Sequence, residues 1–316
     1  MSFEFRAAHR PFSPITAKPV VGSVLVKPGT AEQNPEPHVF RGPGLPGALA
    51  RGMAIAGLVL LPALVIPGIP PETAHLVVLL ALFAAALTAY EYASPYPGLL
   101  EFRFGAPYNR TRFLLIGIAA ALLALLQRHE TDPGALSGVV ATLAAICGDL
   151  LAGAPSPVAL LAQALPDSVS DAQRDLVRDG AALILMFSIC VIALFGSAMH
   201  LGCWPHGGRP FNVWINLPTF EPTAGRDVVA RLRRQSSFSL ILGCALPFLT
   251  PGLILASTIL MQPVSLTSPL GFVWGIVLWA YVSSALIMRG MAMARIAQMI
   301  EERRTRIGIA LSDTDA

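Results

Sequence analysis

Seven long apolar runs dominate this 316-residue sequence. Most of them approach the roughly 20 residues that an α-helix needs to cross a hydrocarbon core about 30 Å thick. A backbone in lipid must satisfy its own hydrogen bonds, and an α-helix does so within one segment. The sequence therefore predicts an all-α integral membrane protein. The runs are residues 53–69, 74–93, 113–126, 134–152, 181–203, 237–262 and 270–288, with a shorter run at 156–165.

Composition supports the same class. Hydrophobic residues make up 54% of the chain and charged residues only 13%, and the mean hydropathy is +0.63. Soluble domains carry about 25% charged residues. A soluble fold with this composition would have too little polar surface to cover itself, so a soluble protein is excluded.

The distribution of Lys and Arg predicts the topology. If all seven long runs crossed the membrane, the 22 basic residues would divide evenly between the two sides. If residues 128–180 instead begin and end outside, segments 1–51, 94–112, 204–236 and 289–316 lie inside with six, three, five and five basic residues. Basic residues concentrate in cytoplasmic loops. The pattern predicts six transmembrane helices with both termini cytoplasmic.

Five regions follow from this topology. The first is a Pro-rich tail that is too polar to bury a core, and we expect it to be disordered. Two three-helix halves flank an extracytoplasmic insertion, and the last span continues as a helical tail. The regions are residues 1–50 (tail), 51–127 (first half), 128–180 (insertion), 181–288 (second half, with a basic cytoplasmic loop at 204–236) and 289–316 (C-terminal helix and tail).

The insertion is predicted to hold a helix at 134–152, a turn at 153–157 and a half-length helix at 158–165. Such a pair is predicted to enter the membrane and return, with two full crossings or a position flat on the outer surface as alternatives. A re-entrant pair is viable only where neighbouring helices cover its turn. The capping-box pattern that begins at Ser170 predicts a further surface helix extending to Arg178.

The sequence predicts a protein of the bacterial cytoplasmic (inner) membrane. Lys occurs only at positions 18 and 27, against 20 Arg, which indicates a GC-rich genome. About 50 polar residues precede the first apolar run, whereas a signal peptide places its apolar region within the first 15–30 residues. We expect the first span to remain in the mature protein.

Ionisable residues in the apolar runs are scarce, and two of them are candidates for contact with a substrate or a partner. Asp149 follows Cys147 and Gly148 in the apolar helix of the insertion, and a short carboxylate cannot reach far toward water. If that helix lies on the outer surface instead, Asp149 is simply solvated. Glu91 lies between two tyrosines at the cytoplasmic end of the second span, where interfacial anchoring is the alternative interpretation.

Pro247 and Pro251 lie in the sixth run and remove two backbone donors, which predicts a kinked or broken span. We expect Thr250 and neighbouring helices to satisfy the freed carbonyls. Broken helices line the sites of transporters, although Pro kinks also occur in membrane helices without transport.

Basic residues at the end of loop 204–236 alternate with apolar ones, a pattern typical of a short helix on a lipid surface. The expected lipid contacts are Arg226, Arg231, Arg233 and Arg234. A weak metal hypothesis rests on His200, Cys203 and His206, but Pro205 disrupts their helical spacing. The four cysteines lie in or beside apolar segments, which favours buried thiols over disulfides.

The function is not determined by the sequence, and three hypotheses follow. The first is a non-catalytic subunit, scaffold or assembly factor of a membrane complex. The second is a small-solute transporter that uses Asp149 and the Pro247/Pro251 region. The third is a membrane enzyme with a metal at the His200 cluster. We expect no cofactor; the expected partners are membrane lipids and other membrane proteins, and the small net charge of +3 argues against nucleic acid.

Overall fold

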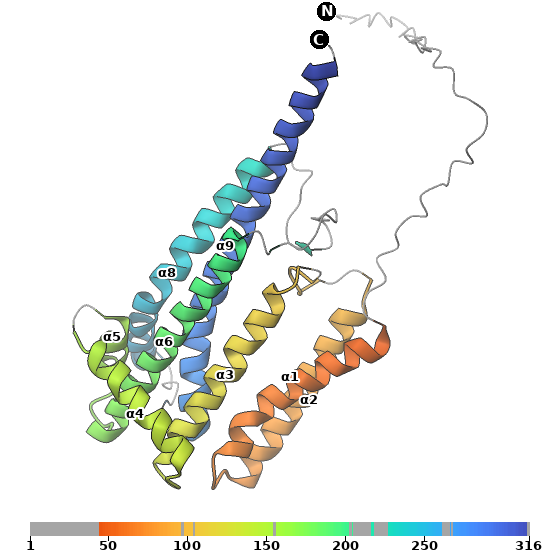
Figure 1. Ribbon diagram of the computed structural model, residues 1–316. Coiled ribbons are helices and arrows are strands. Elements are labelled where there is room, and N and C mark those ends of the chain that lie inside the picture. Colours follow the sequence, from red (N-terminus) through yellow and green to blue (C-terminus); the bar gives the residue numbers. More distant parts are fainter. Residues whose placement is uncertain are drawn as a thin grey trace, which may run out of the picture. The chain divides into compact units, whose positions relative to one another are not determined.

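The computed structural model describes residues 44–95, 98–103, 105–153, 156–201, 204, 216–217, 227–260, 266 and 268–314. Every regular element in this part of the chain is an α-helix (Figure 1). The helices are α1 (Leu45–Val65), α2 (Pro71–Ala93), α3 (Tyr108–His129), α4 (Ala135–Leu150), α5 (Pro157–Gln163), α6 (Asp171–His200), α8 (Val228–Leu260) and α9 (Pro269–Thr314).

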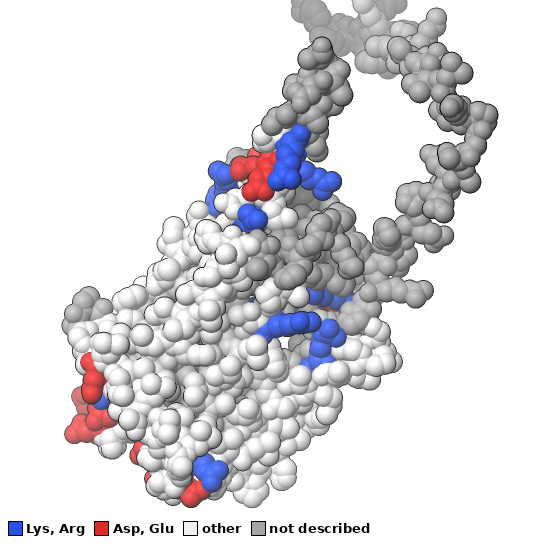
Figure 2. Space-filling view, in the orientation of Figure 1, with Lys and Arg blue, Asp and Glu red and all other residues white. Residues whose placement is uncertain are grey.

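Five of the described helices are long and apolar enough to cross a membrane: α1, α2, α3, α6 and the Pro269–Arg306 part of α9. Their exposed surface is rich in large apolar side chains, as expected where lipid replaces water. On the face in Figure 2, charged side chains collect in a few patches with a broad uncharged surface between them. The protein is therefore all-helical, with the composition of a multi-pass membrane protein.

Several segments that are distant in the sequence meet at one end of the helices, which we call the arginine end. It comprises residues 45–51, 94–112, 200–236 and 289–306 where the structure describes them. The Phe102 N–H donates to the Asn216 carbonyl at 2.7 Å. Arg289 pairs with Glu101, and Arg304 pairs with Asp227. A cluster of buried residues joins the same segments, including Phe102, Phe195, Leu232 and Met293.

The opposite end, which we call the insertion end, holds the α1–α2 turn, residues 129–170 and the start of α9. One hydrophobic cluster joins these segments and includes Ile66, Leu161, Leu266 and Phe272. The Gln173 side chain also donates to the Leu266 carbonyl at 3.3 Å. The insertion is therefore packed against the helices that flank it.

Helices α8 and α9 form a closely packed pair. The Ser236 hydroxyl donates to the Gly290 carbonyl at 2.7 Å. A Cβ added at Gly290 would lie 2.9 Å from the Ser236 carbonyl oxygen, and one at Gly243 would lie 2.9 Å from the Ser283 carbonyl oxygen. Small residues at these positions let the two backbones approach, as is common between membrane helices.

Helices α1 and α2 form a hairpin that packs against fewer neighbouring helices than the α8–α9 pair does. α2 packs against α1 and against no other described helix, while α1 also contacts α3 and, more weakly, α9. Both faces of α2 expose large apolar side chains, among them Leu79 and Phe83. Close approach within the hairpin depends on Gly52, where an added Cβ would lie 2.6 Å from the Ala85 carbonyl oxygen.

The insertion contains two helices near the expected positions. α4 packs against α3 and α6, and α5 packs against α6 and α8. Large apolar residues form an exposed stripe along α4, at Leu136, Val139, Leu143, Ile146 and Leu150. The α5 N-terminus is capped by the Ser156 hydroxyl, which accepts from the Ala159 N–H at 3.0 Å.

Three expectations about boundaries are corrected by the structure. The tail predicted to be disordered to residue 50 already contains the first turns of α1, which begins at Leu45 with Pro46 in its first turn, where proline is favourable. The surface helix predicted after Ser170 is the start of α6, which runs unbroken to His200; the predicted Ser170 cap is present.

The third correction concerns the start of α8. The basic segment that was expected to form a separate surface helix is continuous with the following apolar run. Leu232 is fully buried against the adjoining helices, because α9 extends far enough to cover it. The last span continues as one helix into the C-terminal region, as predicted.

Candidate functional site

A cavity of about 840 Å³ lies at the arginine end, between α1, the end of α2, the α2–α3 loop, α3 and α9. Four arginines line it, together with two tyrosines, one asparagine and a wall of apolar side chains. A patch of blue side chains lies near the upper ends of α1 and α3 in Figure 2. The arginines are Arg51, Arg103, Arg110 and Arg112.

Two of these arginines flank the ring of Tyr92. The guanidinium carbon of Arg51 lies 4.8 Å from the ring centroid, and that of Arg103 lies 5.9 Å from it. Arg103 also donates to the Ser94 carbonyl at 2.5 Å and to the Tyr92 carbonyl. Burial lowers the pKa of Arg103, while its interactions with Tyr92 and Glu91 oppose that shift. Aromatic faces and carbonyls hold both cations in position.

Arg112 lies between two further tyrosine rings. Its guanidinium carbon is 5.5 Å from the Tyr108 centroid and 5.4 Å from the Tyr281 centroid. Its buried Nε has no hydrogen-bond partner in the described part of the chain. Arg110, two residues earlier on α3, is exposed. Within the described ranges, Arg51, Arg110 and Arg112 form no salt bridge with a carboxylate.

The two nearest glutamates are engaged elsewhere. Glu91 is 8% exposed, and its Oε2 accepts the N–H groups of Gly98, Leu99 and Leu100 at 3.0–3.3 Å. Glu101 forms a two-point ion pair with Arg289, with Nε–Oε2 at 2.7 Å and Nη2–Oε1 at 2.9 Å. Glu91 therefore anchors the α2–α3 loop, and Glu101 joins that loop to α9.

A second set of contacts fixes the α2–α3 loop over the cavity. The Trp204 indole N–H donates to the Gly105 carbonyl at 3.0 Å, and the Asn109 amide donates to the Glu101 and Phe102 carbonyls at 2.9 and 3.2 Å. Phe102 is fully buried with a φ of 53°, a conformation that bulky residues rarely adopt. Its ring packs against Tyr108 and Trp204. The α2–α3 loop is therefore fixed by Trp204 and by Asn109 and Tyr108 at the start of α3.

This arrangement is suited to binding an anion. Arginine presents several donors in a planar group that fits phosphate and carboxylate oxygens. The described residues contain no group of three metal-binding side chains close enough to hold a metal ion. Among the described residues that line the cavity there is no carboxylate, histidine or cysteine that would act as a general base or a strong nucleophile.

Asp149 lies at the insertion end, whereas the cavity lies at the arginine end of the helices. It is exposed in the last turn of α4, and the neighbouring Gly148 packs against α6. A Cβ added at Gly148 would lie 2.0 Å from Asp179 Oδ1, and Asp179 accepts from the Arg178 Nε at 2.9 Å. Asp149 thus belongs to a surface group of charges around the α4–α6 contact.

Pro247 and Pro251 both lie inside α8, which continues from Val228 to Leu260 as one helix. Of the predicted kink or break, the break is therefore absent. The Thr250 hydroxyl donates to the Leu246 carbonyl at 2.7 Å. This is the usual i−4 bond of a helical threonine and not the predicted replacement, because Pro247 and Pro251 take the backbone donor from the carbonyls of residues 243 and 247.

The other sequence candidates are dispersed. Arg233 pairs with Glu301 at 2.5 Å, and Arg234 is exposed on the same helix. Arg231 is partly buried. Arg226, Cys203 and His206 lie outside the described residues, and His200 is exposed at the end of α6.

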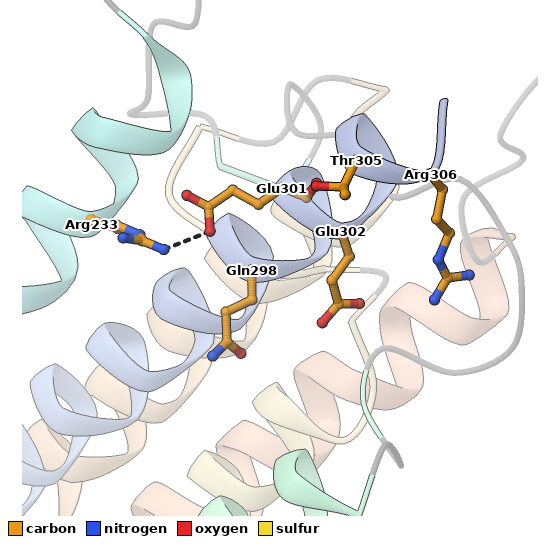
Figure 3. A pocket seen from close by; sticks show the side chains of 6 residues that line it. All are labelled: Arg233, Gln298, Glu301, Glu302, Thr305 and Arg306. Carbon is orange, nitrogen blue, oxygen red and sulfur yellow. Dashed lines mark hydrogen bonds and ion pairs between the residues drawn. The ribbon is translucent and has the colours of Figure 1, made fainter. Parts of the chain in front are cut away.

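A second hollow of about 490 Å³ follows the surface of α9 near its C-terminal part. In Figure 3, Glu301 extends toward Arg233 on α8, while Arg306 extends away from it. Glu302 lies 3.8 Å from Arg295. Long exposed side chains in mutual ion pairs form this hollow, so it has the character of a groove between surface residues. It is lined by Arg233, Gln298, Glu301, Glu302, Thr305 and Arg306.

The sequence did not single out the cavity arginines, which served there only to predict topology. The available signal was their combination: Arg103, Arg110 and Arg112 occupy one short loop and helix start, beside Tyr90 and Tyr92. Comparisons with protein-family models, with curated proteins and with solved structures find no match for this chain. The site must therefore be interpreted from its own geometry.

Proposed function

We propose that this chain is a non-catalytic membrane component, a subunit or scaffold whose role is to bind rather than to transform. In this proposal six helices cross a bacterial inner membrane, with the arginine end and both termini in the cytoplasm. The meeting of residues 94–112, 227–234 and 289–306 at one end supports an even number of crossings. The basic character of that end supports a cytoplasmic location.

The observation that carries the proposal is the chemistry of the arginine cavity. The charged residues of its described lining are all arginines, and the nearby Glu91 and Glu101 are engaged with the loop backbone and with Arg289. Acid–base or nucleophilic catalysis requires a titratable group beside a reacting atom, and apart from the arginines the titratable groups on the described lining are the phenols of Tyr92 and Tyr281, which pack against guanidinium groups. Fixed guanidinium groups instead suit binding and orientation.

The test is purification from native membranes in a mild detergent, followed by native mass spectrometry. We expect a complex of fixed stoichiometry with another membrane protein that survives a second purification step. The matched control is the same preparation after the exposed α2 residues Leu79 and Phe83 are changed to alanine, which preserves helix propensity while reducing the available apolar surface. A lone protein that moves a solute across liposomes would contradict the proposal.

The insertion is proposed to lie in the membrane from its outer side. The exposed apolar stripe of α4 supports this, because a helix wholly in water would expose that surface at a cost of about 25 cal/mol per Å². In a background without native cysteines, Leu143→Cys should resist a water-soluble maleimide, whereas Asp132→Cys in the preceding turn should react. Equal labelling of the two would place α4 in water.

Small-solute transport is the second candidate, supported by a sizeable cavity between helices at one membrane face. From the sequence, this hypothesis depends on Asp149 and on a broken α8. Because α8 is continuous, Asp149 is the residue that tests it. Asp149→Asn should abolish uptake by reconstituted protein while Asp132→Asn leaves it intact. For the metal hypothesis, elemental analysis of the purified chain is the test: stoichiometric zinc or iron would support a site around His200.

A further inference from the structure

We infer that the arginine cavity binds an amphiphile with a phosphate headgroup, supplied by the cytoplasmic leaflet as an anionic phospholipid. This inference rests on the proposed orientation of the chain and adds a ligand class to the proposed binding function. Its three supports are an excess of fixed positive charge, a continuous apolar wall and a position at the end of the membrane-crossing helices.

The charge excess comes from arginines on separate elements. Arg51 lies on α1, Arg103 on the loop, and Arg110 and Arg112 on α3. Like charges that line one cavity repel one another, and no carboxylate in the described part of the chain forms a salt bridge with Arg51, Arg110 or Arg112. Glu101 attracts Arg112 at longer range, but its carboxylate is already paired with Arg289. An anion from outside the chain would remove that repulsion, and the interaction is strongest where water is partly excluded.

The type of anion follows from the donors. Guanidinium groups bind phosphate oxygens through paired N–H donors, and several of them can share one phosphate. The Nε of Arg112 is buried without a hydrogen-bond partner among the described residues, so it retains a donor. The Tyr92 ring packs against the Arg51 guanidinium, and the Tyr281 ring packs against that of Arg112. Because both side chains are already held in place, they lose less conformational entropy when an anion binds.

The apolar wall distinguishes a lipid from a free phosphate. Ile55 on α1 and Phe113, Leu114 and Ile116 on α3 line the same cavity, within one to four residues of an arginine. Leu114 is 55% exposed. Hydrocarbon placed against these side chains is favourable, whereas inorganic phosphate gains nothing from them. Basic pockets between membrane helices on the cytoplasmic side are suited to anionic lipid headgroups.

The experiment measures lipid binding by native mass spectrometry of the full chain in detergent. The probes are phosphatidylglycerol, phosphatidylcholine, sn-glycerol 3-phosphate and inorganic phosphate. We expect one phosphatidylglycerol to bind at least about tenfold more tightly than phosphatidylcholine, with neither soluble phosphate competing at similar concentration. Equal affinity for the two lipids would overturn the inference, and effective competition by soluble phosphate would replace the lipid with a soluble ligand.

The variant is Arg51→Gln combined with Arg110→Gln, which removes two charges without touching the more buried Arg112. The matched control is Arg303→Gln with Arg306→Gln, which removes two exposed charges from the same end but outside the cavity. We expect phosphatidylglycerol affinity to fall at least tenfold in the first variant and to change less than twofold in the second. Equal losses would show a general surface attraction and overturn the site.

Arg112→Lys gives a second check that does not depend on net charge. Lysine keeps the charge but lacks the planar fork, so the affinity should fall while the Tm of the lipid-free protein stays within a few degrees. Unchanged lipid affinity would contradict the proposed geometry. A failure of these tests, with a stoichiometric protein partner still recovered, would leave the proposed scaffold function standing.

Discussion

The α8–α9 pair and the α1–α2 hairpin are both antiparallel, and both use glycines to bring backbones close, yet they differ in support. Among the described helices, α9 packs against α3, α6 and α8, whereas α2 packs against α1 alone. The cavity lies where the hairpin meets α3 and α9. In the proposed binding site, the α1–α2 hairpin, which has fewer neighbouring helices, leaves room for a ligand, and the α8–α9 pair provides the rigid side.

The largest loss of thermal stability is expected at the ion pair that joins α9 to the α2–α3 loop. Arg289→Leu leaves Glu101, whose side chain is 14% exposed, without the cation of its ion pair. Removing one partner of a fully buried pair costs about 3–5 kcal/mol, and the cost here should be smaller because the Arg289 side chain is 26% exposed. We expect a marked fall in the Tm of the detergent-solubilised protein, measured by differential scanning fluorimetry.

The control for that change is Arg233→Leu on α8. Its pair with Glu301 is largely exposed, with side-chain exposures of 60% and 42%, and such pairs contribute about 0–1 kcal/mol. If both variants lowered the Tm equally, the Arg289–Glu101 pair would not be the principal connection between α9 and the loop.

Within the α8–α9 pair, Gly290→Val should cost about 1–3 kcal/mol, the usual range for overpacking. The new side chain would meet the Ser236 carbonyl oxygen, at 2.9 Å from its Cβ, and the Leu240 side chain. Because α9 also contacts α3 and α6, we expect global destabilisation. Thermal unfolding measures it, and an unchanged Tm would show that the two helices can separate at little cost.

Within the hairpin, Gly52→Val should displace α2, since its Cβ would lie 2.6 Å from the Ala85 carbonyl oxygen. Because α2 contacts no other described helix, we expect faster proteolysis of the α1–α2 turn and only a small Tm change. Gly57→Val is the control, because nothing lies within 4 Å of a Cβ there. A Tm loss as large as that of Gly290→Val would show the hairpin to be as tightly integrated as α9.

The smallest effect is a pH dependence at the exposed start of α8. The hydrogen bond from Arg304, with backbone donors adding to it, holds the pKa of Asp227 below its ordinary value of 3.8. This contribution is present above pH 3.8 and disappears as pH falls through the lowered folded-state pKa. Hydrogen exchange of the first α8 turn should rise only below about pH 4, and Asp227→Asn should remove that dependence. A change near neutral pH would implicate another group.

Much of the helical framework was predictable because apolar runs and arginine placement are local properties. The helices at 135–150 and 157–163 fall within the predicted insertion, and α9 continues past its span as expected. Boundaries were less predictable. The start of α8 was predicted to be a surface helix because Arg alternates there with Val and Leu. That local pattern cannot show that α9 covers Leu232 and buries it.

The candidate site was largely unpredictable for the same reason. Glu91 was singled out as an isolated charge, but its role as acceptor for three loop N–H groups depends on the path of residues 98–100. Arg51 and Arg112 are 61 positions apart in the sequence. No spacing rule predicts that they line one cavity with Tyr281.

The sequence alone determined the class of this protein: helices in lipid need long apolar segments, and such segments are visible without any knowledge of packing. Only the tertiary structure decided which charges are neutralised and which remain available. Pairing depends on distances between residues from different helices, and those distances arise from how glycines, loop hydrogen bonds and the Glu101–Arg289 ion pair set the helices beside one another.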